Sequence, residues 1–436
     1  MSRFPSRSRR NYFVCLLFLT AVCAPVLAGT LTLEAALSTV ESAHPDLLLA
    51  QAERDSAIAD IDIAESRQDT SINLEGILRS GRQIIGGNDF ASDHSVRLTA
   101  RKTLYDFGRS ANTELAAKFE LNAREAELTT ILDKRRLEIM TRYFEVLLAD
   151  MESTLDRELT SVYYTSFIHA QDRLALGQIS SVDLAQLEIR YRDTVEKRKA
   201  SEQRQRITRA MLANAINRPG DLPDDLEDPM LPGNQRNLPD YEILLPVMLN
   251  NNLRLRAQQD LLAASQKRIE SLRAENGPTL DAEVQAADYS RTATTRDNLS
   301  AGLILSWPLY QGNRSDSRVA REIAQLNKLR AGTDKLKMEL TQALLESCLD
   351  IIRLQSTARE AAQKNTEYRD LLLERSRGLY ELELKSNLGT SMADTSAARL
   401  RARRNEYQLA LRFARLEALI GRPLSQTGDK QREMEK

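Results

Sequence analysis

The sequence repeats itself, and this repeat limits what the chain can fold into more than any other feature. Three short segments of the first half recur in the second half, in the same order and at nearly the same offset. They are residues 48–51 (LLAQ) and 255–258 (LRAQ), 104–110 (LYDFGRS) and 309–315 (LYQGNRS), and 215–219 (AINRP) and 419–423 (LIGRP). A repeat of this kind indicates one structural unit written twice. We therefore expect two similar halves within one architecture.

Each half changes its hydrophobic period from that of a helix to that of strands and back. The sequence predicts helices at 33–69, 110–176 and 181–216 in the first half and at 241–275, 315–384 and 389–420 in the second. A helix as long as 110–176 spans about 100 Å, which favours a rod over a compact domain. The two shorter helices of each half together match the long one in length. We expect them to stack end to end beside it, which gives four helical columns.

A proline-rich linker separates the two halves. We assign residues 29–217 to the first repeat and 241–421 to the second. The linker, 218–240, holds five prolines, which interrupt helices: Pro219, Pro223, Pro229, Pro232 and Pro239. Residues 422–436 are polar and charged, and we expect them to form a disordered tail.

The N-terminus has the pattern of a secretory signal peptide. Four arginines among the first ten residues precede an almost entirely apolar run, 12–27, and small residues at Val26 and Ala28 suit signal peptidase. We predict that residues 1–28 are removed. The alternative is an uncleaved anchor, which the short apolar run disfavours, since a spanning helix needs about 20 residues. Neither Cys15 nor Cys23 lies in a lipoprotein context, so no lipid anchor is expected.

Between the first and second helices of each half, apolar and polar side chains alternate. Two strands are predicted within 71–105 and two within 279–309. Each run has about the 9–11 residues of a tilted transmembrane strand, and one apolar and one polar face is typical of a membrane barrel. A half-buried sheet of a soluble domain would give the same alternation. The signal peptide favours the barrel. The number of strands favours it too, because four strands leave two unpaired edges, whereas three chains supply 12 strands that can close.

Aromatic residues, glycines and a proline gather where the strands end and the long helices begin. These junction residues are Tyr105 and Gly108 in the first half, and Trp307, Pro308, Tyr310 and Gly312 in the second. Glycine and proline suit a sharp turn from strand to helix. The aromatic rings fit an interfacial belt, although ordinary packing at a strand end would explain them equally well.

No catalytic, cofactor or metal site is predicted. The three histidines, His44, His94 and His169, lie far apart, without metal-ligand spacing. Cys348 has helical spacing from neighbouring apolar residues, which predicts that it is a core residue. The net charge of −1 gives no basic excess to attract nucleic acid. We therefore expect a protein that is not an enzyme and that binds no nucleic acid.

The order and duplication of these motifs resemble the TolC-like outer-membrane efflux protein family. Residues 104–109 (LYDFGR) and 307–312 (WPLYQG) resemble its strand-to-helix element, 416–421 (LEALIG) its closing helix motif, and 176–184 (LGQISSVDL) its periplasmic hairpin tip. The resemblance covers nearly the whole mature chain. It implies a homotrimer with a shared 12-stranded barrel in the outer membrane and a long periplasmic tunnel of helices. It also implies a periplasmic adaptor and an inner-membrane pump as partners, in drug efflux, metal efflux or type I secretion.

In such proteins the periplasmic tips contact the adaptor and close the tunnel. The first tip, 177–183, has Gly177 to break the helix, Ser180 or Ser181 to cap the next one, and Asp183 at its positive end. The second tip, 385–390, contains Ser386, Asn387 and Gly389. Here the chain departs from the family pattern, because Gly389 stands where an acidic residue often follows the cap. Asp394 comes later and is the candidate for a tunnel constriction.

Two other classes compete with the duct. A soluble periplasmic coiled-coil scaffold or adaptor would share the long helices and would lack lipid-facing strands. An extracytoplasmic enzyme would need a catalytic constellation, which the sequence does not supply. The fold class that we predict is mainly α with a small β part: an α-helical barrel joined to a β-barrel that a trimer completes.

Overall fold

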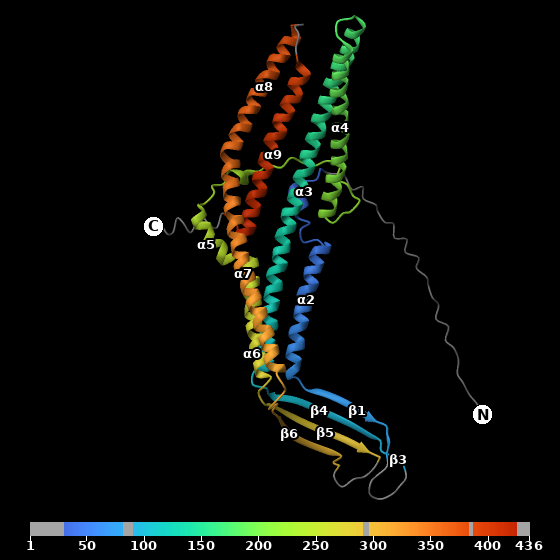
Figure 1. Cartoon of the computed structure of the whole chain (residues 1–436), viewed down its shortest axis with the longest axis vertical. Coiled ribbons are helices and arrows are strands. Elements are labelled where there is room, and N and C mark those ends of the chain that lie inside the picture. The colour runs from blue at the N-terminus through green and yellow to red at the C-terminus, as the bar shows by residue number, and fades with distance from the viewer. Residues whose placement is uncertain (1–29, 82–89, 291–295, 383–386, 425–436) are drawn as a thin grey trace, which may run out of the picture.

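The computed structural model describes residues 30–81, 90–290, 296–382 and 387–424. The predicted signal peptide lies outside these residues. Long helices run side by side along most of the molecule, and a four-stranded sheet extends from one end of them (Figure 1). The predicted fold class, mainly helical with a small sheet, is confirmed.

The longest helix is the backbone of the rod. Helix α3 (Arg109–Ala175) has 67 residues and contains neither glycine nor proline, so nothing in its sequence interrupts the hydrogen-bond ladder. Helices α2 (Pro45–Glu65) and α4 (Ser181–Ala215) both pack against it. In Figure 1, α2 lies beside the half of α3 near the sheet and α4 beside the other half. This is the stacking that the helix lengths predicted for the first half.

The second half builds its column from more pieces. Helix α7 (Arg314–Arg353) continues through one π-helical turn (Leu354–Ala358) into α8 (Arg359–Glu381), and α6 (Leu253–Ala274) and α9 (Leu388–Ile420) pack beside this column. The sequence predicted one regular helix over 315–384. A π turn inserts an extra residue and frees backbone groups, and here the side-chain amide of Asn405 donates to the carbonyl of Ala358 at 3.1 Å.

The first helix of each half is broken, where the sequence predicted a continuous one. Helix α1 (Leu33–Leu37) ends before α2 begins at Pro45, because proline has no N–H to continue a helix and favours the first turn. His44 caps α2 by accepting a hydrogen bond from the backbone of Asp46 at 3.2 Å.

The matching break in the second half lies between α5 (Tyr241–Asn251) and α6. The side chain of Asn252 accepts hydrogen bonds from the backbone N–H groups of Arg254 and Leu255, at 3.0 and 3.1 Å. Its amide also donates to the carbonyl of Leu419 at 2.8 Å. Asn252 therefore caps α6 and ties it to the end of α9.

The sheet consists of β1 (Ser71–Ile77), β4 (Ser95–Tyr105), β5 (Thr279–Tyr289) and β6 (Leu299–Ser306). These four strands are antiparallel in the order β1-β4-β5-β6, so each half contributes two neighbouring strands and β1 and β6 are the edges. A short pair, β2 (Ser80–Gly81) and β3 (Ala91–Ser92), extends the first hairpin and was not predicted.

Aromatic side chains join the two halves near the middle of the rod. The rings of Phe144 on α3 and Tyr407 on α9 are stacked, with centroids 4.6 Å apart and planes 1° from parallel. The hydroxyl of Tyr407 donates to Asp228 at 2.7 Å. The hydroxyl of Tyr143 lies 2.7 Å from the carbonyl oxygen of Leu31 and 2.6 Å from that of Glu227. The linker is therefore bound to the helices through Glu227 and Asp228.

The predicted tail begins later than expected. Leu424 is 5% exposed and belongs to the same apolar cluster as Ile420 and Leu416 of α9. Its backbone N–H donates to the carboxylate of Glu417 at 3.1 Å. Residues 422–424 therefore continue the fold, and 425–436 lie outside the described residues.

Gly421 ends α9 at a point with no room for a side chain. It has φ +75°, and a Cβ atom there would lie 2.4 Å from the backbone oxygen of Asn251. We predict that Gly421→Ala lowers the free energy of unfolding by about 1–3 kcal/mol, from the left-handed backbone and the clash together. Thermal unfolding of the purified protein measures this.

Gly332→Ala is the matched control. Gly332 lies within α7, and nothing is within 4 Å of an added Cβ. Because alanine is the better helix former, this variant should be more stable than the wild type by up to about 1 kcal/mol. Equal effects at the two positions would contradict the packing described for Gly421.

Candidate functional site

The sheet has one continuous apolar face. Residues directly opposite each other in neighbouring strands point to the same side. The register therefore forms two apolar rows across all four strands, in the order β1, β4, β5 and β6: Ile72, Ala100, Val284 and Ala301, and then Leu74, Leu98, Ala286 and Leu299. Leu74 and Leu299 are each 72% exposed, and the sheet extends beyond the ends of the helices (Figure 1). An exposed apolar surface of this kind marks an interaction with a membrane or another protein.

The opposite face of the sheet is polar and carries ion pairs. Arg101 on β4 donates to the carboxylate of Glu283 on β5 at 2.9 Å. On the same face, Arg97 lies 3.5 Å from the carboxylate of Glu75 on β1. Opposite charges facing each other across neighbouring strands stabilise the pairing. The sheet therefore separates a water-compatible surface from an apolar one.

Asp93 holds the two hairpins together at the end of the sheet far from the helices. Its carboxylate accepts hydrogen bonds from Arg79 at 2.7 Å and from Arg296 at 3.2 Å, so it joins both halves of the chain. Nearby, the backbone N–H of His94 donates to the hydroxyl of Ser290 at 2.7 Å. The sequence does not predict this cluster, because no local pattern pairs residues so far apart. The segments that connect the strands of each hairpin, 83–93 and 291–297, lie mostly outside the described residues.

The strand-to-helix junctions contain the predicted turns. Gly108 and Gly312 have φ of +83° and +57°, and Phe107 has φ +56°. The carboxylate of Asp106 accepts a hydrogen bond from the backbone of Ser110 at 2.8 Å, and the Ser110 hydroxyl also bonds to it. Asp106 thereby satisfies one of the free N–H groups at the start of α3.

The junction side chains are exposed in both halves. Tyr105 is 57% exposed, and Trp307 and Tyr310 are exposed still more. Pro308 is half-buried. The indole N–H of Trp307 donates to the carbonyl of Asn276 at 3.2 Å, which fixes the ring at the end of β6. These exposed aromatic rings lie at the end of the apolar face that is next to the helices, and their place in an interfacial belt stays a prediction.

The first hairpin tip, between α3 and α4, has the predicted turn. Gly177 has φ +68°, and the N–H of Gln178 donates to the carbonyl of Arg173 at 2.8 Å, as in a glycine-terminated helix. Ser180 and Asp183 form a reciprocal capping box, and Ser181 is the first residue of α4. The Ser180 hydroxyl and backbone N–H hold the pKa of the Asp183 carboxyl below its usual range.

The second tip differs from the first. Ser386 lies outside the described residues. Asn387 is the N-cap of α9, but its side chain makes no capping hydrogen bond. Gly389 lies in the first turn, where an added Cβ would be 2.9 Å from Cγ2 of Val162 on α3. The start of α9 therefore lies against the first hairpin, and any side chain in place of Gly389 would require Val162 or α9 to shift.

Asp394, the candidate constriction residue, lies within α9 and is paired. Its carboxylate accepts a hydrogen bond from Arg369 of α8 at 2.6 Å. Both side chains are only partly exposed. The charge of Asp394 is thus balanced within its own hairpin, and no cluster of acidic residues forms around it among the described positions.

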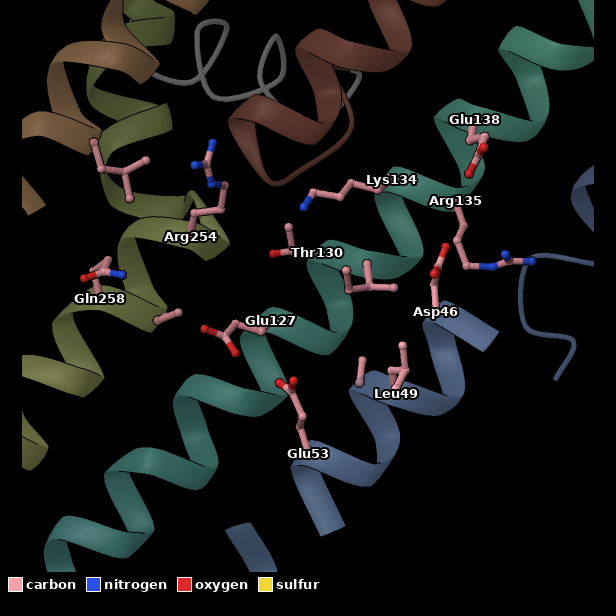
Figure 2. A pocket seen from close by; sticks show the side chains of 14 residues that line it. Asp46, Leu49, Glu53, Glu127, Thr130, Lys134, Arg135, Glu138, Arg254 and Gln258 are labelled. Carbon is pink, nitrogen blue, oxygen red and sulfur yellow. The ribbon is translucent and has the colours of Figure 1, made fainter. Parts of the chain in front are cut away.

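A groove on the rod lies between α2, α3 and α6, and Figure 2 shows the side chains that line it. Both acidic and basic residues line it: Asp46, Glu53, Glu127, Glu138, Lys134 and Arg254. Arg135 points away from the groove, and its buried guanidinium donates to the carbonyls of Val40 and Ala215 at 3.1 and 3.3 Å. Mixed charges of this kind are typical of helix faces in water, and these side chains offer no nucleophile with an adjacent base.

Metal and thiol chemistry find no support in the part of the chain that the structure describes. Within those residues, no three His, Cys, Asp or Glu side chains are grouped to hold a metal ion. Cys348 is a buried core residue, as predicted, and burial raises the pKa of its thiol. Among the described residues, no helix is both long and apolar enough to cross a membrane.

Comparisons with known proteins agree with this architecture. Residues 36–218 match the family described as outer membrane efflux protein. No curated protein matches the chain. The VceC outer membrane protein of Vibrio cholerae has 15% identity and a TM-score of 0.69, over 90% of this chain and 96% of that one. The CmeC outer membrane channel of Campylobacter jejuni has 12% identity and a TM-score of 0.73, over 92% and 88%.

A third similar structure is the open state of the MtrE outer membrane channel of Neisseria gonorrhoeae. It has 16% identity and a TM-score of 0.70, over 90% of this chain and 89% of that one. At such low identity these structures establish the fold, and the family match rests on the first half of the chain. Residues 36–218 thus match the outer membrane efflux protein family, and the whole chain shares the fold of these outer membrane channels, which agrees with the resemblance of the sequence motifs.

Proposed function

We propose that the protein is the outer-membrane channel of a tripartite efflux or type I secretion system, a passive exit duct from the periplasm to the exterior. The observation that carries this proposal is the uncovered apolar face of the sheet, with its polar face on the other side. Lipid would cover the apolar face, and water would fill a lumen lined by the polar one.

A homotrimer would complete this arrangement. One chain supplies four strands, with β1 and β6 at the edges. In a bilayer, unpaired backbone groups at a sheet edge are too costly, so membrane sheets close into barrels. Pairing β6 of one chain with β1 of the next, three times over, would give 12 strands and no edge.

The helices would form the periplasmic part of the duct. At 1.5 Å per residue, α3 extends about 100 Å from the sheet. We propose that the two tips contact a periplasmic adaptor, which in turn contacts an inner-membrane pump. The tip residues are Gly177, Ser180, Ser181, Asp183, Ser386, Asn387 and Gly389. We also propose that the lumen narrows at Asp394. The ion pair with Arg369 reduces the negative charge at this position.

The alternative, a soluble periplasmic scaffold or adaptor, is disfavoured by the same sheet. A soluble scaffold would have to cover two apolar rows that no helix of the described chain covers. The duct needs no chemistry of its own.

Electron microscopy of the detergent-extracted mature protein tests the assembly. We expect a threefold particle with a helical rod of about 100 Å and a detergent belt around the sheet end. A monomeric rod without a detergent belt would overturn the duct and would leave the periplasmic scaffold as the better explanation.

One substitution on each face of the sheet tests which face meets lipid. We predict that Leu98→Arg, on the apolar face, costs about 2–4 kcal/mol if the residue lies near the middle of the bilayer, and greatly reduces the trimer in the outer-membrane fraction. Thr99→Arg, one residue along β4 on the polar face, should assemble as the wild type does. The lipid-facing assignment fails if both variants assemble equally well.

The exposed apolar residues at the first tip provide a test of adaptor contact. Leu176 and Val182 are 71% and 75% exposed there. We predict that Leu176→Asp lowers cross-linking to the adaptor and export at least tenfold while the trimer stays intact, since buried apolar anchors dominate such interfaces. Arg67→Asp, an exposed position at the sheet end of α2, is the control. Loss of export with normal cross-linking would assign Leu176 to the lumen instead.

A further inference from the structure

One cation, Lys102, lies on the mainly apolar face of the sheet. The acidic residue of that face, Asp288, lies toward the other end of β5, opposite Val96. Lys102 pairs with Ala282 of β5, which in turn pairs with Leu303 of β6, and all three side chains therefore point to the same side. Lys102 is exposed. It makes no ion pair with any carboxylate of the described residues, whereas its neighbour Arg101 on the polar face is bound to Glu283. The ammonium is therefore available to a group from outside the chain.

The repeat indicates where Lys102 lies relative to the boundary between lipid and water. The segments 104–110 and 309–315 correspond, so Lys102 occupies in the first half the position that Trp307 occupies in the second. Tryptophan and lysine share a preference for the boundary between lipid and water. The long aliphatic stem of lysine can lie along apolar surface while the ammonium reaches the headgroups.

A β-bulge brings a second donor beside this lysine. Thr103 pairs with Asp281, but Tyr105 pairs with Leu280, so Leu104 is the extra residue. Without the bulge, Lys102 and Tyr105 would point to opposite faces, because they are three positions apart. With it, both lie on the apolar face, opposite two residues of β5 that are neighbours on that face.

Tyr105 is held in place and its hydroxyl is available. Its ring packs edge-on against Phe107, with centroids 5.0 Å apart. Among the described residues its hydroxyl has no hydrogen-bond partner, in contrast to the indole N–H of Trp307. β4 lies between β1 and β5, so both donors belong to one chain and do not depend on contacts between chains.

We propose that Lys102 and Tyr105 bind the headgroup phosphate of an anionic phospholipid at the membrane boundary next to the helices. The ammonium supplies the charge and the phenol a directed hydrogen bond, while the apolar rows above them contact the acyl chains. The proposal rests on the proposed function, because it requires that this face of the sheet meets lipid. It goes further by assigning a specific lipid contact to one position of the barrel.

Native mass spectrometry of the delipidated trimer tests the proposal, with phosphatidylglycerol and zwitterionic phosphatidylcholine as the probes. We expect the wild type to bind phosphatidylglycerol more tightly than phosphatidylcholine. Lys102→Met should weaken phosphatidylglycerol binding about fivefold and leave phosphatidylcholine binding unchanged. Lys102→Arg should retain the preference. Tyr105→Phe should weaken binding by a smaller factor, since it removes one hydrogen bond and no charge.

Lys364→Met is the matched control. It removes an equally exposed lysine from α8, far from the sheet, and should bind both lipids as the wild type does. The proposal is overturned if Lys102→Met keeps the wild-type preference, or if the wild type does not distinguish the two lipids. It is also overturned if neither Lys102→Met nor Lys102→Gln assembles while Lys102→Arg does, because the lysine would then serve folding.

The same spectra separate this inference from the proposed function. If all variants are trimers and bind both lipids equally, the headgroup site is disproved and the channel proposal stands. If the protein is a monomer that binds neither lipid, both the headgroup site and the channel proposal are disproved.

Discussion

The open edges of the four-stranded sheet are the constraint on which the rest of the structure depends. An antiparallel sheet with an uncovered apolar face is stable only where something apolar covers that face, and where the backbone groups of its edge strands find partners. Lipid and two further copies of the chain meet both needs in the proposed assembly. The polar face, with Arg101 paired to Glu283, then becomes the wall of a water-filled lumen. The helices continue the strands, so the number of chains around the sheet also sets the number of helices around the duct.

The middle of the rod keeps the two halves of each chain in register. Phe144 and Tyr407 stack across the halves, and the linker is fixed between them. Burial and the nearby carboxylates raise the pKa of both tyrosine hydroxyls, Tyr143 and Tyr407, so they stay protonated as hydrogen-bond donors. Beside them, burial lowers the pKa of Arg135, which donates to two backbone carbonyls in place of a carboxylate. Buried polar groups that are satisfied in this way make an arrangement specific, since any shift would leave them unpaired.

The sequence predicted what depends on local pattern and missed what depends on distant contacts. Helix α3 and the four main strands follow from an unbroken helical period and from a clear change to a period of two. The first tip was predicted correctly because Gly177 can end a helix and Ser180 can cap the next one. The break at Pro45 was readable in principle, because proline favours the first turn of a helix.

Local sequence pattern could not predict three features: the π turn, the cap at Asn252 and the cluster at Asp93. Each depends on a partner far away in the sequence, such as Asn405 for the π turn and Leu419 for Asn252. The bulge at Leu104 likewise requires the register of β5, so the face on which Lys102 and Tyr105 meet cannot be derived from β4 alone. Short-range periodicity therefore predicts the helices and strands. The contacts between side chains of the two repeats cannot be predicted in this way.

The two tips differ in how the helix that follows each of them begins. In the first tip, the capping box between Ser180 and Asp183 satisfies the start of α4 without help from any other element. In the second, Asn387 makes no capping hydrogen bond, and Gly389 lies against Val162 of α3. A side chain at 389 would meet Cγ2 of Val162, so either Val162 or α9 would have to shift, and this packing favours glycine there. The start of α4 is thus capped by residues of its own tip, whereas the start of α9 packs against the first hairpin.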